Sequence, residues 1–208
     1  PYARLYSVWE NRVLLRAPSP WLKNFQHKCS EVLIDGRLDY GASFRKFVNV
    51  LRAEPEIFGD DPHFKSQRTH LGGDQVAFTH LFRVDKPGEL DIFATQLGQR
   101  VGMKIEPRRL NEGLGLKHLD VMDAQTASVV EQIYEDDFDA YGFERVSFPS
   151  ISPIALASVG ETKAINYARD VTARLVQLSQ LARYRQRSRY LLAQILRNSG
   201  LRRYKKHR

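Results

Sequence analysis

The sequence predicts a helix-rich protein of the mixed α/β class, with one domain followed by a helical extension. Apolar residues recur at spacings of three and four over most of the chain, which is typical of amphipathic helices. Residues 76–84 instead alternate with a period of two, which predicts a strand. The chain has 208 residues, of which 42% are hydrophobic, so it can bury a proper core.

The first segment is predicted to form an amphipathic helix that runs to about Leu15. Pro1 suits the first helical position, because its missing N–H has no intrahelical partner there. The prolines at positions 18 and 20 are expected to end the helix. Its apolar face is formed by Leu5, Tyr6, Trp9 and Val13.

Three further elements are expected in the middle of the chain. Ser43 is interpreted as the N-cap of a helix that reaches Leu51. The segment 76–84 is predicted to be a strand buried on both faces, because its two alternating sets of side chains are largely apolar. Residues 90–97 are predicted to form a helix that a following glycine closes.

The last part of the domain is predicted to be helical from Val121 to Phe138, with Gly142 as its stop signal. The three acids at 135–137 are interpreted as a solvated helix face, since consecutive helical residues do not converge. We expect the domain to cover residues 1–148, a linker 149–154, and a basic helical C-terminal extension 155–208.

Charge is concentrated in the extension. Residues 171–208 contain eleven Lys and Arg and no Asp or Glu, whereas the formal net charge of the whole chain is +8. This pattern indicates an electrostatic arm for a polyanionic partner. No apolar run is long enough to cross a membrane, and the single cysteine, Cys29, excludes an internal disulfide.

A dense polar loop at residues 60–70 admits three interpretations. It is a solvated loop, because polar residues belong in loops. Alternatively, His63, His70 and His80 hold a metal, although no recognised ligand spacing links them. In the third interpretation the loop faces a bound acceptor.

Several segments resemble the PAPS-dependent sulfotransferases, in the order that this family has them (PAPS is 3'-phosphoadenylyl sulfate). Pro1-x-x-Arg4-x-x-Ser7 is similar to the later part of the segment that holds the 3'-phosphate. Asp61-Pro62-His63-Phe64-Lys65-Ser66-Gln67 resembles an acceptor-side loop of the carbohydrate sulfotransferases. The strand and helix that end at Gln96-Leu97-Gly98, and the closing pattern Tyr134-x-x-Asp137-Phe138, also resemble the family.

The resemblance implies an α/β nucleotide-binding fold of the P-loop type that lacks its first strand–loop–helix unit, and so an N-terminally incomplete domain. It implies transfer of a sulfuryl group from PAPS to a hydroxyl of a carbohydrate acceptor, for which a polyanionic sugar is one option. The implied roles are cofactor binding for Arg4 and Ser7, general-base catalysis for His63, and acceptor binding for Lys65 and Arg68. The loop for the 5'-phosphosulfate is expected upstream of Pro1, and no metal is expected.

The rival interpretation is a non-enzymatic module that binds nucleic acid or another polyanion through the basic extension. A helical interaction protein without chemistry is a third. Nucleic acid is the less favoured partner if the family resemblance holds. The expected location is the cytoplasm, or the Golgi lumen if an N-terminal anchor precedes this sequence. The identity of the acceptor does not follow from the sequence.

Overall fold

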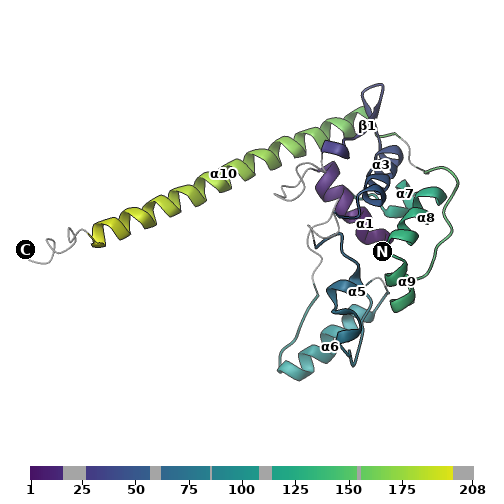
Figure 1. Cartoon of the computed structure of the whole chain (residues 1–208), viewed down its shortest axis with the longest axis horizontal. Helices are drawn as coiled ribbons and strands as arrows, with labels where there is room; N and C mark the ends of the chain where they lie inside the picture. Colours follow the sequence, from purple (N-terminus) through teal and green to yellow (C-terminus); the bar gives the residue numbers. More distant parts are fainter. Residues whose placement is uncertain (16–26, 57–61, 85, 108–113, 154–155, 199–208) are drawn as a thin grey trace, which may run out of the picture. The chain divides into compact units, whose positions relative to one another are not determined.

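The computed structural model describes residues 1–15, 27–56, 62–84, 86–107, 114–153 and 156–198. The prolines at positions 18 and 20, which are expected to end the first helix, and the end of the tail after Asn198 lie outside these residues. In the described part, helices predominate and a single two-stranded sheet accompanies them (Figure 1). The broad prediction of a helix-rich mixed α/β protein is therefore confirmed.

The chain divides into two compact units that interleave along the sequence. Unit 1 comprises residues 1–8 and 48–153, and unit 2 comprises residues 9–47 and 154–208. One boundary between the units falls inside helix α3 (Tyr40–Ala53).

Unit 1 is built from short helices around an aromatic and aliphatic core. The core includes Leu5, Phe64, Val130 and Phe138, none of which exposes more than 1% of its surface. Burial of each such side chain stabilises the fold by about 2 kcal/mol. The helices are α1 (Tyr2–Val8), α5 (Gln67–His70), α6 (Glu89–Val101), α7 (His118–Val121), α8 (Ala124–Ile133) and α9 (Glu135–Tyr141), with a 3-10 turn at Gly73–Gln75.

Helix ends in unit 1 follow the expected cap chemistry. Asp123 accepts the backbone N–H of Thr126 and so caps α8. Gly142 follows α9 with φ of 59° and Gly102 follows α6 with φ of 68°, a conformation that glycine adopts without steric cost. The predicted stop at Gly142 is confirmed, although the helix expected from Val121 to Phe138 is interrupted at Met122 and Asp123 and again at Tyr134.

The predicted strand at residues 76–84 is wrong, because this segment has no regular secondary structure. A strand requires a neighbour that satisfies its backbone N–H and C=O groups, and the described part of unit 1 offers none. Four large apolar side chains of the segment remain exposed, from 47% at Val76 to 77% at Val84, whereas Phe82 is half-buried. The alternation of side chains is present in the sequence, but the segment does not pair with another strand in the described part of the chain.

Unit 2 contains the sheet, a hairpin of β1 (Val32–Ile34) and β2 (Arg37–Asp39). The strands are antiparallel, with Val32 opposite Asp39. Asp35 and Gly36 both have positive φ, as a tight hairpin turn with the right-handed strand twist requires. Asp35-Gly36 is a turn signal in the sequence, but the three-residue strands that flank it are too short to show a period.

Helix α3 begins at Tyr40, three residues before the expected N-cap. The Ser43 prediction is wrong, because its hydroxyl accepts the backbone N–H of Val32 in β1. The cap is Asp39, whose carboxylate accepts the N–H of Ala42 at 2.8 Å. Trp9 of the π-helical segment Trp9–Leu14 packs edge-to-face on Phe44 of α3.

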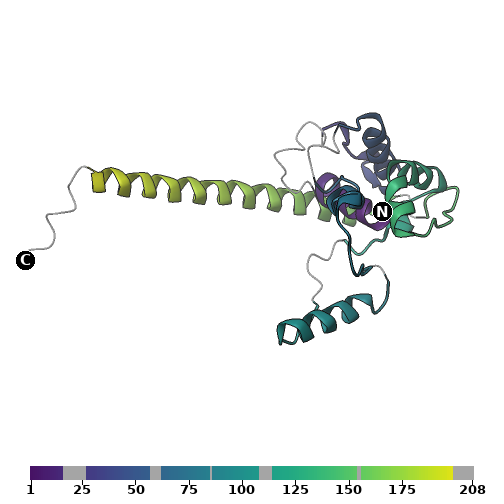
Figure 2. The ribbon, with the colours of Figure 1, turned by 60° about the horizontal axis from the view of Figure 1, so that its bottom comes forward.

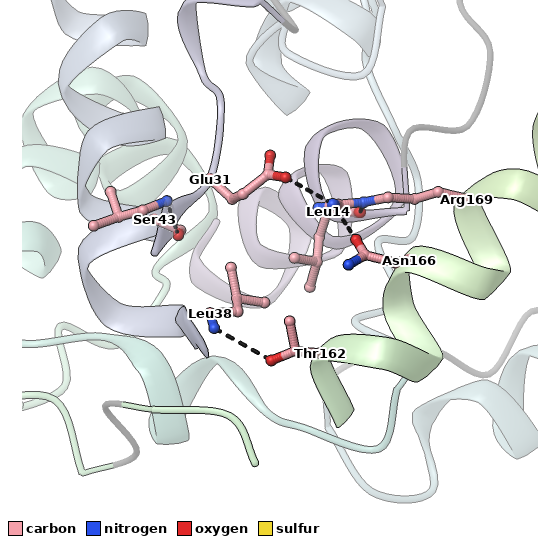
Figure 3. Close-up of polar contacts among 8 residues, drawn as sticks. Leu14, Glu31, Leu38, Ser43, Thr162, Asn166 and Arg169 are labelled. Carbon is pink, nitrogen blue, oxygen red and sulfur yellow. Dashed lines mark hydrogen bonds and ion pairs between the residues drawn. The ribbon is translucent and has the colours of Figure 1, made fainter. Parts of the chain in front are cut away.

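The extension begins with one continuous helix, α10 (Val159–Asn198), which is unbroken and straight in two views (Figures 1 and 2). Its first turns are fixed to the hairpin and to the π-helical segment (Figure 3). Thr162 Oγ1 accepts the N–H of Leu38, and Arg169 donates to the Leu14 carbonyl at 2.6 Å. Arg169 also pairs with Glu31 at 2.8 Å, with both side chains largely buried.

Candidate functional site

Unit 1 contains a cavity of about 820 Å³ that collects residues from five separate segments of the chain. The segments are the start of α1, helix α5, residues 81–84, the first residue of α7, and residues 141–146. A cavity of this size is in the range of small-molecule sites. Its lining comprises Pro1, Tyr2, Ala3, Arg4, Gln67, His70, Leu71, Leu81, Phe82, Arg83, Val84, His118, Tyr141, Phe143, Glu144 and Val146.

The lining combines aromatic rings with an excess of basic groups. Arg4, Arg83, His70 and His118 contribute basic side chains, whereas Glu144 is the one acid among the lining residues that the structure describes. Burial lowers the pKa of His118, so its neutral form is favoured in the folded protein. The two guanidinium groups remain charged at any ordinary pH. The cavity is therefore suited to an anionic ligand that also carries a planar or apolar group.

One guanidinium nitrogen of Arg4 lacks a hydrogen-bond acceptor among the described residues. Its Nη2 donates to the carbonyl of Pro62 at 3.2 Å. Its Nη1 is buried and has no hydrogen-bond partner among the residues that the structure describes. A buried donor without an acceptor costs about 1–3 kcal/mol. An anion placed beside Arg4 would remove that cost.

The loop that precedes α5 is held by a buried carboxylate. Asp137 is completely buried, and its two oxygens accept the backbone N–H groups of Gln67 and Arg68 at 2.8 and 2.9 Å. These are the first N–H groups of α5, which have no intrahelical partner. Tyr134 donates its hydroxyl to the carbonyl of Phe64 at 2.9 Å. Residues 64–68 are thus fixed to the junction of α8 and α9.

The start of α1 is fixed in the same region. Tyr2 donates its hydroxyl to Glu131, and burial together with this bond raises the pKa of Tyr2. The Tyr2 ring packs edge-to-face on Phe138 and Phe148, with centroids 5.2 and 5.1 Å apart. It also lies parallel to the ring of His118. These contacts determine where Arg4, half a turn later, meets the cavity.

Arg83 is positioned by its neighbours on the other side of the lining. Its guanidinium lies 4.5 Å from the centroid of the Phe143 ring, and its Nη1 donates to the carbonyl of Gly142 at 3.1 Å. Its backbone N–H donates to Glu89 at the start of α6. Residues 81–84 are therefore held to α6 and to the end of α9 without forming a strand.

The structure brings only some of the expected site residues to the cavity. Arg4 is in the lining, whereas Ser7, one turn later on α1, is exposed and outside it. His63, Lys65 and Arg68 also lie outside the lining. Arg68 instead donates to both oxygens of Asp74, at 2.9 and 2.8 Å.

Sequence reasoning missed three residues that matter here. Gln67 and His70 come from the predicted acceptor loop, but they line the cavity where His63 does not. Asp137 was assigned to a solvated acidic face, and that prediction is wrong because it is completely buried. Its position three residues after Tyr134 and seven after Val130 placed it on the buried face of a helical pattern, and that signal was available.

Among the described residues, no group of three or more His, Cys, Asp or Glu side chains is arranged to hold a metal ion. Within the same residues, no helix is long and apolar enough to cross a membrane. No family model matches the chain, and no curated protein and no solved structure matches it either.

Proposed function

We propose that the protein transfers a sulfuryl group from PAPS to a hydroxyl of a carbohydrate acceptor. The observation that carries the proposal is the meeting of three separate segments, each of which resembles a sulfotransferase segment. Arg4 of the first donates to Pro62 of the second. Asp137 of the third accepts from Gln67 of the second. Segments that form one site in a family are expected to meet in space, and these do.

The residues present fit a phosphorylated nucleotide. The buried, unpartnered Nη1 of Arg4 is a donor that awaits an acceptor, and phosphate oxygens are strong acceptors. Arg4 and Ser7 are three residues apart on α1, so they share a helix face on which one phosphate can contact both. When bound, PAPS supplies the sulfuryl group that the acceptor hydroxyl receives. We assign its 3'-phosphate to Arg4 and Ser7.

The acceptor is assigned to the loop before α5. His63 is exposed, so an acceptor hydroxyl can reach it, and an imidazole nitrogen can accept the proton of that hydroxyl as a general base. Lys65 is half-buried beside it and provides a positive charge for an acidic sugar. Arg68 is shared with Asp74, so its attraction for an acceptor is partly neutralised.

We further propose that the domain belongs to the P-loop type of α/β nucleotide-binding fold. Residues 76–84 support this by composition alone, since they have the two-sided apolar pattern of a buried strand although they form none in this structure. The turn at Gly88 and the helix α6 that follow this segment support the same interpretation.

The test is an activity assay on the protein in its natural full length. Radiolabelled PAPS is incubated with neutral, carboxylated and sulfated polysaccharides, and label in the polymer is counted. Arg4→Ala is expected to lower kcat/KM at least about tenfold, because a charge-assisted hydrogen bond is lost. Arg100→Ala, an exposed arginine on α6, is the control and should match the parent. No transfer to any polysaccharide, or an unchanged Arg4→Ala enzyme, contradicts the proposal.

A second candidate function is binding of a polyanion through α10. The observation that favours it is the exposure of Arg183, Arg185 and Arg189, with no acid after Asp170. Binding through these groups would weaken steeply with salt, because it rests on counterion release. Titration of the chain with heparin at two salt concentrations tests it, and salt-insensitive binding would contradict it.

A further inference from the structure

Helix α10 has two different faces over residues 159–181. The face of Thr162, Ile165 and Arg169 packs against the rest of unit 2, and Ile165 is only 3% exposed. These residues are three and four positions apart, so they lie on one side of the helix. Figure 3 shows two of them, Thr162 and Arg169, pointing toward the rest of unit 2. This side fixes which residues of α10 point away from unit 2.

The opposite side carries an apolar stripe, which we define as Val171, Leu175, Leu178 and Leu181. Its spacing of four, three and three residues keeps the four side chains on one side of the helix. Val171 is 37% exposed, and the three leucines are between 59% and 61% exposed. Exposed leucines are ordinary one at a time, but a contiguous row of them marks an interaction surface.

The stripe lies in a strongly cationic helix. Residues 159–198 contain eight Lys and Arg against two acids, and both acids precede the stripe. Arg174 lies within the stripe, and the exposed Arg185 and Arg189 follow it on the same side of the helix, 14 and 18 residues after Val171. A partner for this face must therefore accept apolar side chains and positive charge together.

Three kinds of partner meet that requirement to different degrees. Nucleic acid neutralises the arginines but leaves the leucines in water, because its backbone offers them no apolar surface. A second copy of the chain covers the leucines but brings two helices of the same net charge together, which is unfavourable. An anionic lipid surface receives both, since leucines enter the acyl boundary and the arginines reach the headgroups.

We infer that α10 docks on an anionic lipid surface through the stripe and its flanking arginines. The helix lies along the surface, with the stripe toward the acyl chains. The side that holds Thr162, Ile165 and Arg169 then faces away from the lipid and keeps its contacts with unit 2. This inference does not depend on sulfuryl transfer.

The experiment is co-sedimentation of the whole chain with vesicles of phosphatidylcholine, with and without phosphatidylserine. The test variant carries Leu175→Gln and Leu178→Gln, and the matched control carries Leu33→Gln and Leu119→Gln, two exposed leucines elsewhere. The parent and the control are expected to bind the phosphatidylserine vesicles and to bind the neutral ones at least about tenfold more weakly. The test variant should lose at least about tenfold in binding to the anionic vesicles.

Other results would overturn the inference. Equal binding of parent and test variant to anionic vesicles shows that the stripe does not enter the lipid. Binding of duplex DNA that is stronger than vesicle binding, and unchanged by the leucine substitutions, assigns α10 to nucleic acid. A dimer in sedimentation velocity that the test variant abolishes assigns the stripe to a second copy. Circular dichroism confirms that each variant is folded before any of these comparisons.

Discussion

Asp137 accepts the backbone N–H of Gln67 at 2.8 Å, and this bond joins two segments that are 70 residues apart in the sequence. The same carboxylate accepts the N–H of Arg68. The bonds cap α5 from outside the helix, which is unusual because most caps come from the residue just before the first turn. The placement of Gln67 and His70 in the cavity depends on this contact.

Removal of the Asp137 carboxylate is expected to destabilise unit 1. Asp137→Ala leaves two buried N–H groups without acceptors, so the free energy of unfolding should fall by about 3 kcal/mol. Asp139→Ala is the control, since Asp139 pairs with Arg145 at the surface and should change stability little. Urea denaturation measures both. An equal fall in the free energy of unfolding for both substitutions would contradict a stabilising role for the buried Asp137 contact.

Tyr134 provides a second, independent link to the same loop. Tyr134→Phe removes the hydroxyl that donates to the Phe64 carbonyl, in a position where Tyr134 is only 3% exposed. We expect a loss of about 1 kcal/mol in the free energy of unfolding. Tyr167→Phe on the exposed side of α10 should cause no change. A neutral Tyr134→Phe would mean that water replaces the bond without cost.

His118 should make stability depend on pH. Burial lowers its pKa in the folded state below the usual 6.5, so the unfolded chain takes up the proton first as pH falls. Stability from this group is therefore complete above pH 6.5 and declines as the pH falls below it. Urea denaturation from about pH 8 to pH 5 should show the decline in the parent and a smaller one in His118→Gln. Parallel curves for the two proteins would contradict the burial of His118.

Arg169 is predicted to fix the first half of α10 to unit 2. Arg169→Lys removes the fork that reaches the Leu14 carbonyl and Glu31 together, because a lysine ammonium cannot span both. Amide hydrogen exchange over residues 159–170 should become at least about tenfold faster. Arg174→Lys, an exposed arginine one and a half turns later, should exchange as the parent does. If the amide exchange rates over residues 159–170 do not change in Arg169→Lys, then Arg169 does not hold α10 to unit 2, and the apolar contacts of α10 alone do so.

The sequence predicted the helices well and the strands poorly, for a physical reason. Helix α10 repeats its apolar pattern over many turns, and the end of α9 at Gly142 depends on the conformation of a single glycine. Both features could therefore be predicted from the local sequence. Strand formation depends on a partner, which a local pattern does not report. Residues 76–84 have the pattern without a partner, and Val32–Ile34 has a partner with almost no pattern.

The site was partly predictable for a similar reason. Arg4 was found because it stands in a recognisable motif at a helix start, and it does line the cavity. Arg83 and His118 reach the cavity only through tertiary contacts, with Phe143 and Tyr2 respectively, that no local spacing encodes. The burial of Asp137 could have been predicted from its spacing to Tyr134, but the two adjacent acids favoured the interpretation of a solvated face.

The most direct test of the account is a calorimetric titration of the natural full-length protein with desulfated PAPS, 3'-phosphoadenosine 5'-phosphate. The account predicts binding by the parent and by Arg100→Ala with the same Kd. Arg4→Ala should bind at least about tenfold more weakly, because the guanidinium that holds the 3'-phosphate is lost. Binding of the same tightness by Arg4→Ala, or no binding by the parent at millimolar nucleotide, would contradict the assignment of this site.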